Sequence, residues 1–312
     1  MCIRFKFEKS NLGRLLVAMI FAGVLFVKVS FPVTVLAGFG VFYFLIKNLE
    51  TEITSPIAKG ILTVLFLGGG SIFTTHLIQY LLLDAELRAK ITDTKLQLNV
   101  LCCLAVYLVI QIFTRNAGLT CVIAHCALMS FAGVNYFVYL FRGNEFIFSD
   151  LRSAATGLSV AGNYEFVLDD RAAYVVLISA LFVALVRKFR LKFEKKMWMI
   201  LICTVLAIAS CAYVADQSQG IVTETWEQKG SYRNGYLLNF ALSVRDSFVS
   251  APDGYSKEEI GQLEKQYSGD GDSYVEHDTE KKPTIIVVMS ESYSDLNVVG
   301  TIRTNEEVTP YF

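Results

Sequence analysis

The sequence predicts a polytopic α-helical membrane domain, followed by the first part of an extracellular α/β domain. The 312-residue chain is 54% hydrophobic and has a mean hydropathy of +0.46, more than an ordinary soluble domain carries. Its charges are divided: residues 1–215 hold 20 Lys/Arg and 12 Asp/Glu, whereas residues 216–312 hold 8 and 17. An apolar, basic part and an acidic part indicate two environments.

The first apolar region runs from Leu15 to Ile46, which is too long for one membrane crossing. Lys28, Ser30 and Pro32 interrupt it, and Lys28 can extend its ammonium to the interface. We therefore expect an N-terminal hairpin of two helices. One span followed by a re-entrant segment is the alternative.

Five further segments have about the 20 mostly apolar residues that a membrane-spanning helix needs. These segments are residues 60–83, 96–114, 117–141, 172–187 and 197–215. They predict a five-helix core, which with the hairpin gives about seven transmembrane helices. The exact span count is left open between five and seven.

Basic residues in short loops predict the orientation, because such loops stay in the cytoplasm. The N-terminal arm carries Arg4, Lys6, Lys9 and Arg14 against Glu8. The loop 187–196 holds six basic residues and one acidic residue. With seven crossings, we expect a multi-pass plasma-membrane protein with a cytoplasmic N-terminus and an extracellular C-terminal domain.

The predicted domains are a transmembrane domain (1–215), a juxtamembrane connector (216–282) and the opening of an extracellular domain (283–312). The connector contains an amphipathic stretch from Ser231 to Phe240 and a short helix with a capping box formed by Ser256 and Glu259. Residues 268–282 have the composition of a flexible linker. The acidic tail excludes a nucleic-acid partner, because phosphate backbones require clusters of Lys and Arg.

The membrane domain contains few residue types that carry chemistry. All seven cysteines precede residue 216, so we expect small apolar fillers and no disulfide framework. The polar residues in the predicted spans favour interhelical hydrogen bonds over a transport path; they are His76, Gln79, Gln111, His125 and Asn135. The run Gly68–Gly70 favours close helix packing.

The candidate site residue is Glu291, which ends the apolar run Thr284-Ile-Ile-Val-Val-Met-Ser-Glu-Ser292. The run predicts a buried parallel strand, and ligands of open α/β sheets bind at the carboxyl ends of such strands. A carboxylate there suits an oxygen-preferring divalent metal. Capping of a following helix is the structural alternative, and Ser292 and Asp295 fit that role better.

Four motifs resemble the membrane-anchored lipoteichoic acid synthase-like proteins of Gram-positive bacteria. They are F-R-G at 141–143, S-D-L at 149–151, V-A-G-N-Y at 160–164 and I-I-V-V-M-S-E-S-Y-S-D-L at 285–296. This chain has Asn144-Glu145 where family members often carry Thr-Pro. The resemblance implies that residues 283–312 open a catalytic domain of the sulfatase-like, alkaline-phosphatase type.

The resemblance implies a metal-dependent phosphotransferase in which Glu291 binds Mn²⁺ or Mg²⁺. Such an enzyme moves glycerol phosphate from phosphatidylglycerol, through a phosphothreonine, to an extracellular polymer or glycolipid. The family's nucleophile and remaining ligands come later than Phe312, and Thr309 is not assigned as the nucleophile. The 312 residues are thus expected to be an incomplete, inactive piece of the enzyme.

Two alternatives remain open at this point. The same fold supports phosphoethanolamine transfer and sulfate-ester hydrolysis. A non-catalytic polytopic protein with an extracellular binding tail is the other class.

Overall fold

The computed structural model describes residues 2–29, 32–153, 157, 168–189, 191–192, 196–223, 230–248 and 255–267. The chain forms two compact units, Met1–Val249 and Ser250–Phe312. In the second unit the described part contains helix α12 (Lys257–Tyr267). The Ser256 hydroxyl accepts a hydrogen bond from the Glu259 backbone N–H at 3.0 Å, which confirms the predicted N-terminal cap.

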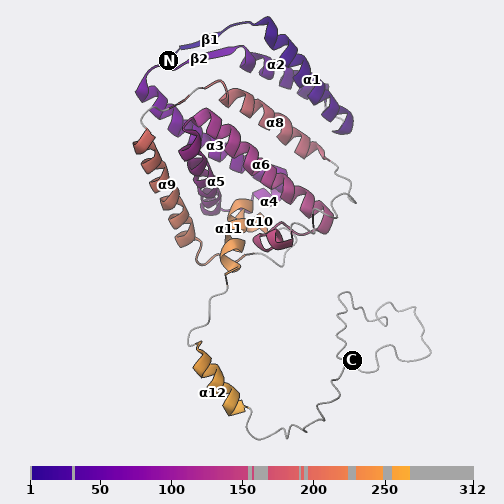
Figure 1. Cartoon of the computed structure of the whole chain (residues 1–312). Helices are drawn as coiled ribbons and strands as arrows, with labels where there is room; N and C mark the ends of the chain where they lie inside the picture. The colour runs from indigo at the N-terminus through magenta and orange to yellow at the C-terminus, as the bar shows by residue number, and fades with distance from the viewer. Residues whose placement is uncertain are drawn as a thin grey trace, which may run out of the picture. The chain divides into compact units, whose positions relative to one another are not determined.

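The first unit is a bundle of long helices (Figure 1). All seven predicted helices are present: α1 (Lys9–Val29), α2 (Val33–Lys47), α3 (Pro56–Leu82), α5 (Asp93–Thr114), α6 (Ala117–Arg142), α8 (Asp170–Val186) and α9 (Lys196–Gln217). Short helices are α4 (Ala85–Arg88), the 3₁₀ helix η1 (Phe148–Ser153), α10 (Ser231–Asn234) and α11 (Tyr236–Asp246).

The bundle has the composition of a membrane domain. Among the described residues, four helices are long and apolar enough to cross a bilayer, namely α3, α5, α6 and the segment Met197–Gln217 of α9. Helix α9 packs against α5 and exposes apolar side chains on its other face, among them Trp198, Leu201 and Val205. Such a surface is unfavourable in water and fits a hydrocarbon environment.

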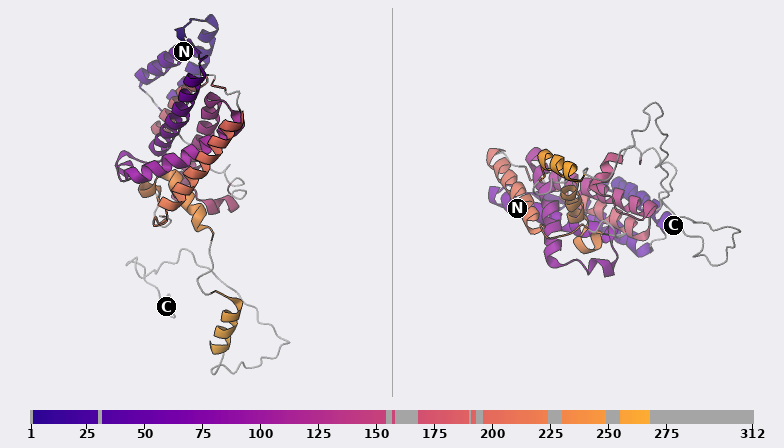
Figure 2. Two further views of the ribbon diagram at one scale, coloured as in Figure 1. Left: turned by 90° about the vertical axis from the view of Figure 1, so that its left-hand side faces the viewer. Right: turned by 90° about the horizontal axis from the view of Figure 1, so that it is seen from below.

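The helices pack in a fixed order across the bundle. Helix α5 contacts α9, α3 and α6, while α8 packs on α3 and α6 and carries the α1–α2 hairpin on its other side (Figures 1 and 2). The predicted hairpin is therefore confirmed as two helices, the first ending at Val29 and the second beginning at Val33. Of the Gly68–Gly70 run, Gly70 alone makes a close approach: a Cβ there would lie 2.9 Å from the Tyr107 ring.

The basic segments meet at one end of the bundle, which we call the basic end. Strand β1 (Cys2–Phe5) pairs antiparallel with β2 (Leu49–Glu52), a sheet that the sequence analysis did not predict. The Thr51 hydroxyl donates to the Lys188 carbonyl at 2.7 Å, and Lys188 Nζ donates to the Lys47 carbonyl at 2.5 Å. Burial, followed by repulsion from Arg14, lowers the Lys188 pKa. The N-terminal arm and residues 187–192 therefore share one side of the bundle.

The polar residues of the spans are mostly structural, as predicted. The His125 Nδ1 and Thr74 Oγ1 atoms are hydrogen-bonded at 2.8 Å between α6 and α3, and Gln111 accepts from Thr120 between α5 and α6. His76 departs from the expected inward orientation, since it lies on the outer surface of α3. The described cysteines are free, and Cys103, Cys121 and Cys203 are buried in the helix-packing core.

Candidate functional site

The predicted metal ligand Glu291 and its strand lie outside the described residues, as do Val160–Tyr164. Within the described part of the chain, no group of three or more His, Cys, Asp or Glu side chains is arranged to hold a metal ion. The described residues that bear on function lie at the end of the bundle opposite the basic end. There the connector helices α10 and α11 dock beside η1 (Figures 1 and 2).

Asn99 of α5 is the main attachment point of the connector. Its Nδ2 atom donates to the Asn234 carbonyl at 2.7 Å, and its Oδ1 atom accepts from the Leu238 backbone N–H at 3.0 Å. Gly235, between these contacts, has φ 77° and ψ 148°, a conformation that only glycine adopts readily. Asn99 is 1% exposed, so its amide supplies the hydrogen bonds that water would otherwise make to these two backbone groups.

Glu145 attaches the connector to the loop that follows α6. Its carboxylate, 9% exposed, accepts hydrogen bonds from the Ser231 backbone N–H at 3.0 Å and from the Ser231 hydroxyl. Buried carboxylates require such partners, because desolvation of the charge is costly. Burial, with the nearby Glu145 as a further contribution, raises the pKa of Tyr236.

Two of the resemblance motifs stabilise this loop. Arg142 of the F-R-G segment forms an ion pair with Asp150 of the S-D-L segment and donates to the Glu145 carbonyl at 2.6 Å. Gly143 ends α6 with φ 74°. The Asp150 carboxylate also accepts from the Ile147 backbone N–H at 2.8 Å. The motifs thus hold Glu145 where it meets Ser231.

The far end of α11 is attached to the segment after α9. Arg245 donates to the carbonyls of Ser218 and Ile221 at 2.8 and 3.0 Å, and Asp246 accepts from Thr223. Hydrogen bonding to Arg245 is the main cause that lowers the pKa of the Asp246 carboxyl. The part of the connector formed by α10 and α11 is consequently held at both of its ends.

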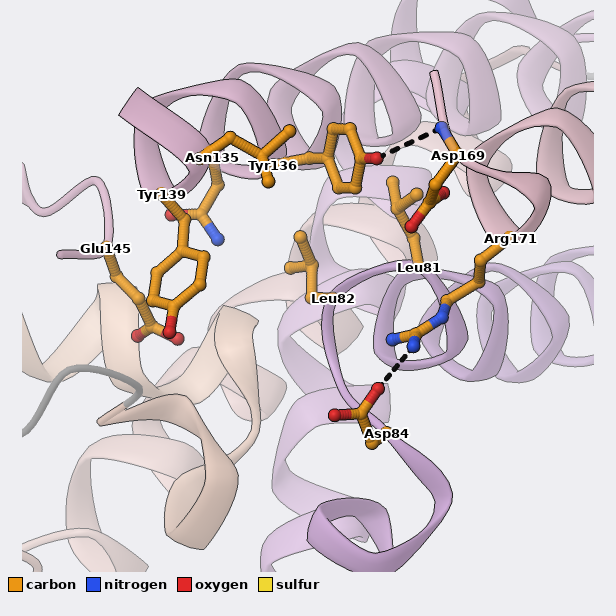
Figure 3. A pocket seen from close by; sticks show the side chains of 10 residues that line it. Leu81, Leu82, Asp84, Asn135, Tyr136, Tyr139, Glu145, Asp169 and Arg171 are labelled. Atoms are coloured by element: carbon orange, nitrogen blue, oxygen red, sulfur yellow. Dashed lines mark hydrogen bonds and ion pairs between the residues drawn. The ribbon is translucent and has the colours of Figure 1, made fainter. Parts of the chain in front are cut away.

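A polar pocket of about 120 Å³ opens between the ends of α3 and α6 and the start of α8 (Figure 3). Its charged and polar side chains are those of Asp84, Asn135, Tyr136, Tyr139, Glu145, Asp169 and Arg171, and its apolar wall is formed by Leu81, Leu82 and Leu140. Arg171 and Asp84 form an ion pair, and Asp169 caps α8 by accepting from the Ala172 backbone N–H at 2.7 Å.

The sequence analysis missed most of these residues. The sequence indicates Asn135 as a polar residue within a predicted span, and Asn144-Glu145 as a difference from the Thr-Pro of the similar family. Asn99, Ser231, Asp84 and Arg171 carried no signal, because each becomes important only through a partner that is distant in the sequence. The Asn234-Gly235 dipeptide is a common turn signal and was the one cue for the attachment at Asn99.

No protein-family model, curated protein or solved structure matches this chain.

Proposed function

We propose that this chain is the membrane anchor and catalytic-domain opening of a metal-dependent phosphotransferase of the lipoteichoic acid synthase type. It would transfer glycerol phosphate from phosphatidylglycerol to an extracellular polymer or glycolipid. The motifs at 141–143, 149–151, 160–164 and 285–296 support this family assignment.

The observation that carries the proposal is the position of the connector. Helices α10 and α11 are fixed to the end of the bundle opposite the basic end. Since basic loops remain in the cytoplasm, the connector end is the extracellular end. The chain leaves the first unit from this end, which is where a lipid of the outer leaflet would present its headgroup.

Glu291 would be the contribution of this chain to the metal site. Its carboxylate is a hard oxygen ligand that suits Mn²⁺ or Mg²⁺, and a bound divalent ion neutralises phosphate charge and activates a hydroxyl nucleophile. The remaining ligands and the threonine nucleophile would be supplied from outside these 312 residues.

The proposed topology predicts a clear result with reporter fusions. A reporter that is active only outside the cytoplasm should function when fused after Asp216 and fail within residues 187–196, because these positions lie at opposite ends of the bundle. The measurement is enzyme activity of each fusion in intact cells, normalised to its amount in the membrane. The reverse pattern would overturn the orientation.

Glu291→Gln tests the proposed chemistry. In the protein extended past Phe312, it should abolish metal-dependent turnover of phosphatidylglycerol, because a neutral amide is a poor ligand for a hard cation. Headgroup release is measured with and without added Mn²⁺. Glu280→Gln, in the predicted linker, is the matched control and should retain activity.

Retained turnover in the Glu291→Gln variant would exclude Glu291 as an essential ligand. If the unchanged extended protein turns over no phospholipid, the non-catalytic class is favoured instead.

A further inference from the structure

The pocket between α3, α6 and α8, which we call the headgroup pocket in view of the proposal below, carries an excess of negative charge. It is lined by three carboxylates, from Asp84, Glu145 and Asp169, and by one guanidinium, from Arg171, for a formal charge of −2. An anion entering alone would be repelled by this set, whereas a cationic group would be attracted. The ion pair of Arg171 and Asp84 places the single positive charge at one side of the pocket (Figure 3).

Asn135 provides an observation independent of the charges. The residue is 1% exposed, and its Oδ1 atom accepts from the Phe146 backbone N–H at 2.7 Å. Its Nδ2 atom points into the pocket (Figure 3) and donates to none of the described residues. Because Oδ1 is held by this hydrogen bond, the amide is fixed in place and Nδ2 can donate to a molecule in the pocket.

The walls indicate an amphiphilic ligand. Leu81 and Leu82 line the interior, and Leu140 is 53% exposed on the outer surface of α6, which an acyl chain would contact in a bilayer. The cavity volume is about 120 Å³, enough for a small polar headgroup.

We propose that the headgroup pocket binds a phosphorylated primary amine of the ethanolamine type. The ammonium would be attracted by the carboxylates of Asp169 and Glu145, while a phosphate or ester oxygen would accept from Asn135 Nδ2 or from Arg171. Arg171 has five N–H donors, and its ion pair with Asp84 does not use all of them. The site lies wholly in the first unit and is independent of the proposed role of Glu291.

Binding of lipids to the purified 312-residue chain tests this site. Native mass spectrometry with phosphatidylethanolamine, phosphatidylglycerol and phosphatidylcholine of equal chain length gives the three apparent affinities. We expect phosphatidylethanolamine to bind about tenfold more tightly than phosphatidylglycerol. Phosphatidylcholine should also bind less well, because its trimethylammonium group is larger.

Asp169→Asn is the most specific variant, since asparagine preserves the cap of α8 while removing one charge. It should lower phosphatidylethanolamine affinity about fivefold to tenfold and raise the affinity for anionic phosphatidylglycerol, because one repelling carboxylate is removed. Asp170→Asn is the matched control: this neighbouring carboxylate is exposed and does not line the pocket. If Asp169→Asn does not fold, Asp169→Ser removes the same charge, and serine also caps helices well.

Soluble O-phosphoethanolamine distinguishes the two sources of this ligand chemistry. Displacement of the lipid at comparable concentration supports a soluble ligand, and failure to displace it supports a lipid. Equal binding of phosphatidylglycerol and phosphatidylethanolamine would overturn the proposal. An equal loss of affinity in the Asp169→Asn and Asp170→Asn variants would overturn it as well, since general surface charge would then explain the binding.

Discussion

Replacing Gly235 with alanine is expected to release the connector from the membrane domain. A Cβ at this position would lie 2.4 Å from Asn99 Nδ2, and the backbone has φ 77° and ψ 148°. The conformation alone costs about 1–3 kcal/mol in a residue other than glycine, and the clash displaces the side chain that holds Asn234 and Leu238. We expect Gly235→Ala to weaken docking by about 3 kcal/mol.

Limited trypsin digestion of the purified protein measures this release. Cleavage after Arg233 or Arg245 should accelerate strongly, because both lie in connector helices that are docked in the unchanged protein. Gly143→Ala is the matched control. Its φ is 74°, but a Cβ there has no neighbour within 4 Å, so only the conformational cost of about 1–2 kcal/mol applies. Equal digestion rates for Gly235→Ala and the unchanged protein would contradict the proposed attachment.

Gly118→Ala should destabilise the membrane domain at its basic end. A Cβ at Gly118 would lie 2.3 Å from the Phe189 carbonyl oxygen and 2.8 Å from that of Val186. Backbone atoms cannot move aside as the end of a side chain can, so α6 and the end of α8 must separate. We expect a loss of about 3 kcal/mol, measured as a lower free energy of unfolding in mixed detergent micelles.

Gly133 offers a control within the same helix. A Cβ there meets nothing within 4 Å, and alanine has a higher helix propensity than glycine. Gly133→Ala should therefore leave stability unchanged or raise it slightly. A similar effect of both substitutions would show that helix propensity, rather than the contact between α6 and α8, governs the outcome.

The two attachments fix α10 and α11 to the end of the bundle opposite the basic end. Asn99 fixes the middle of the connector, and Glu145 fixes its start at Ser231. Glu145 also lines the headgroup pocket. A ligand in that pocket would therefore lie beside a residue that holds Ser231 at the start of α10.

Helix positions were predictable because they depend on local composition. In a bilayer no water is present to pair with the backbone, so an apolar run forms a helix, in which each N–H and C=O is paired within the segment. The predicted spans 96–114 and 117–141 accordingly coincide with α5 and α6 to within a few residues. The β1–β2 pair was missed because each strand has four residues, and short strands are stabilised by their partner rather than by their own pattern.

The sequence by itself determined that this chain has a helical, apolar domain of membrane type, which segments form its long helices, and which segments are basic. These properties follow from composition and from periodicity over adjacent residues. The tertiary structure decided that Asn99 meets Gly235, that Glu145 meets Ser231 and that Arg171 meets Asp84. Those pairs are separated by 86 or more residues, so their hydrogen bonds and charges act together only after the helices have packed.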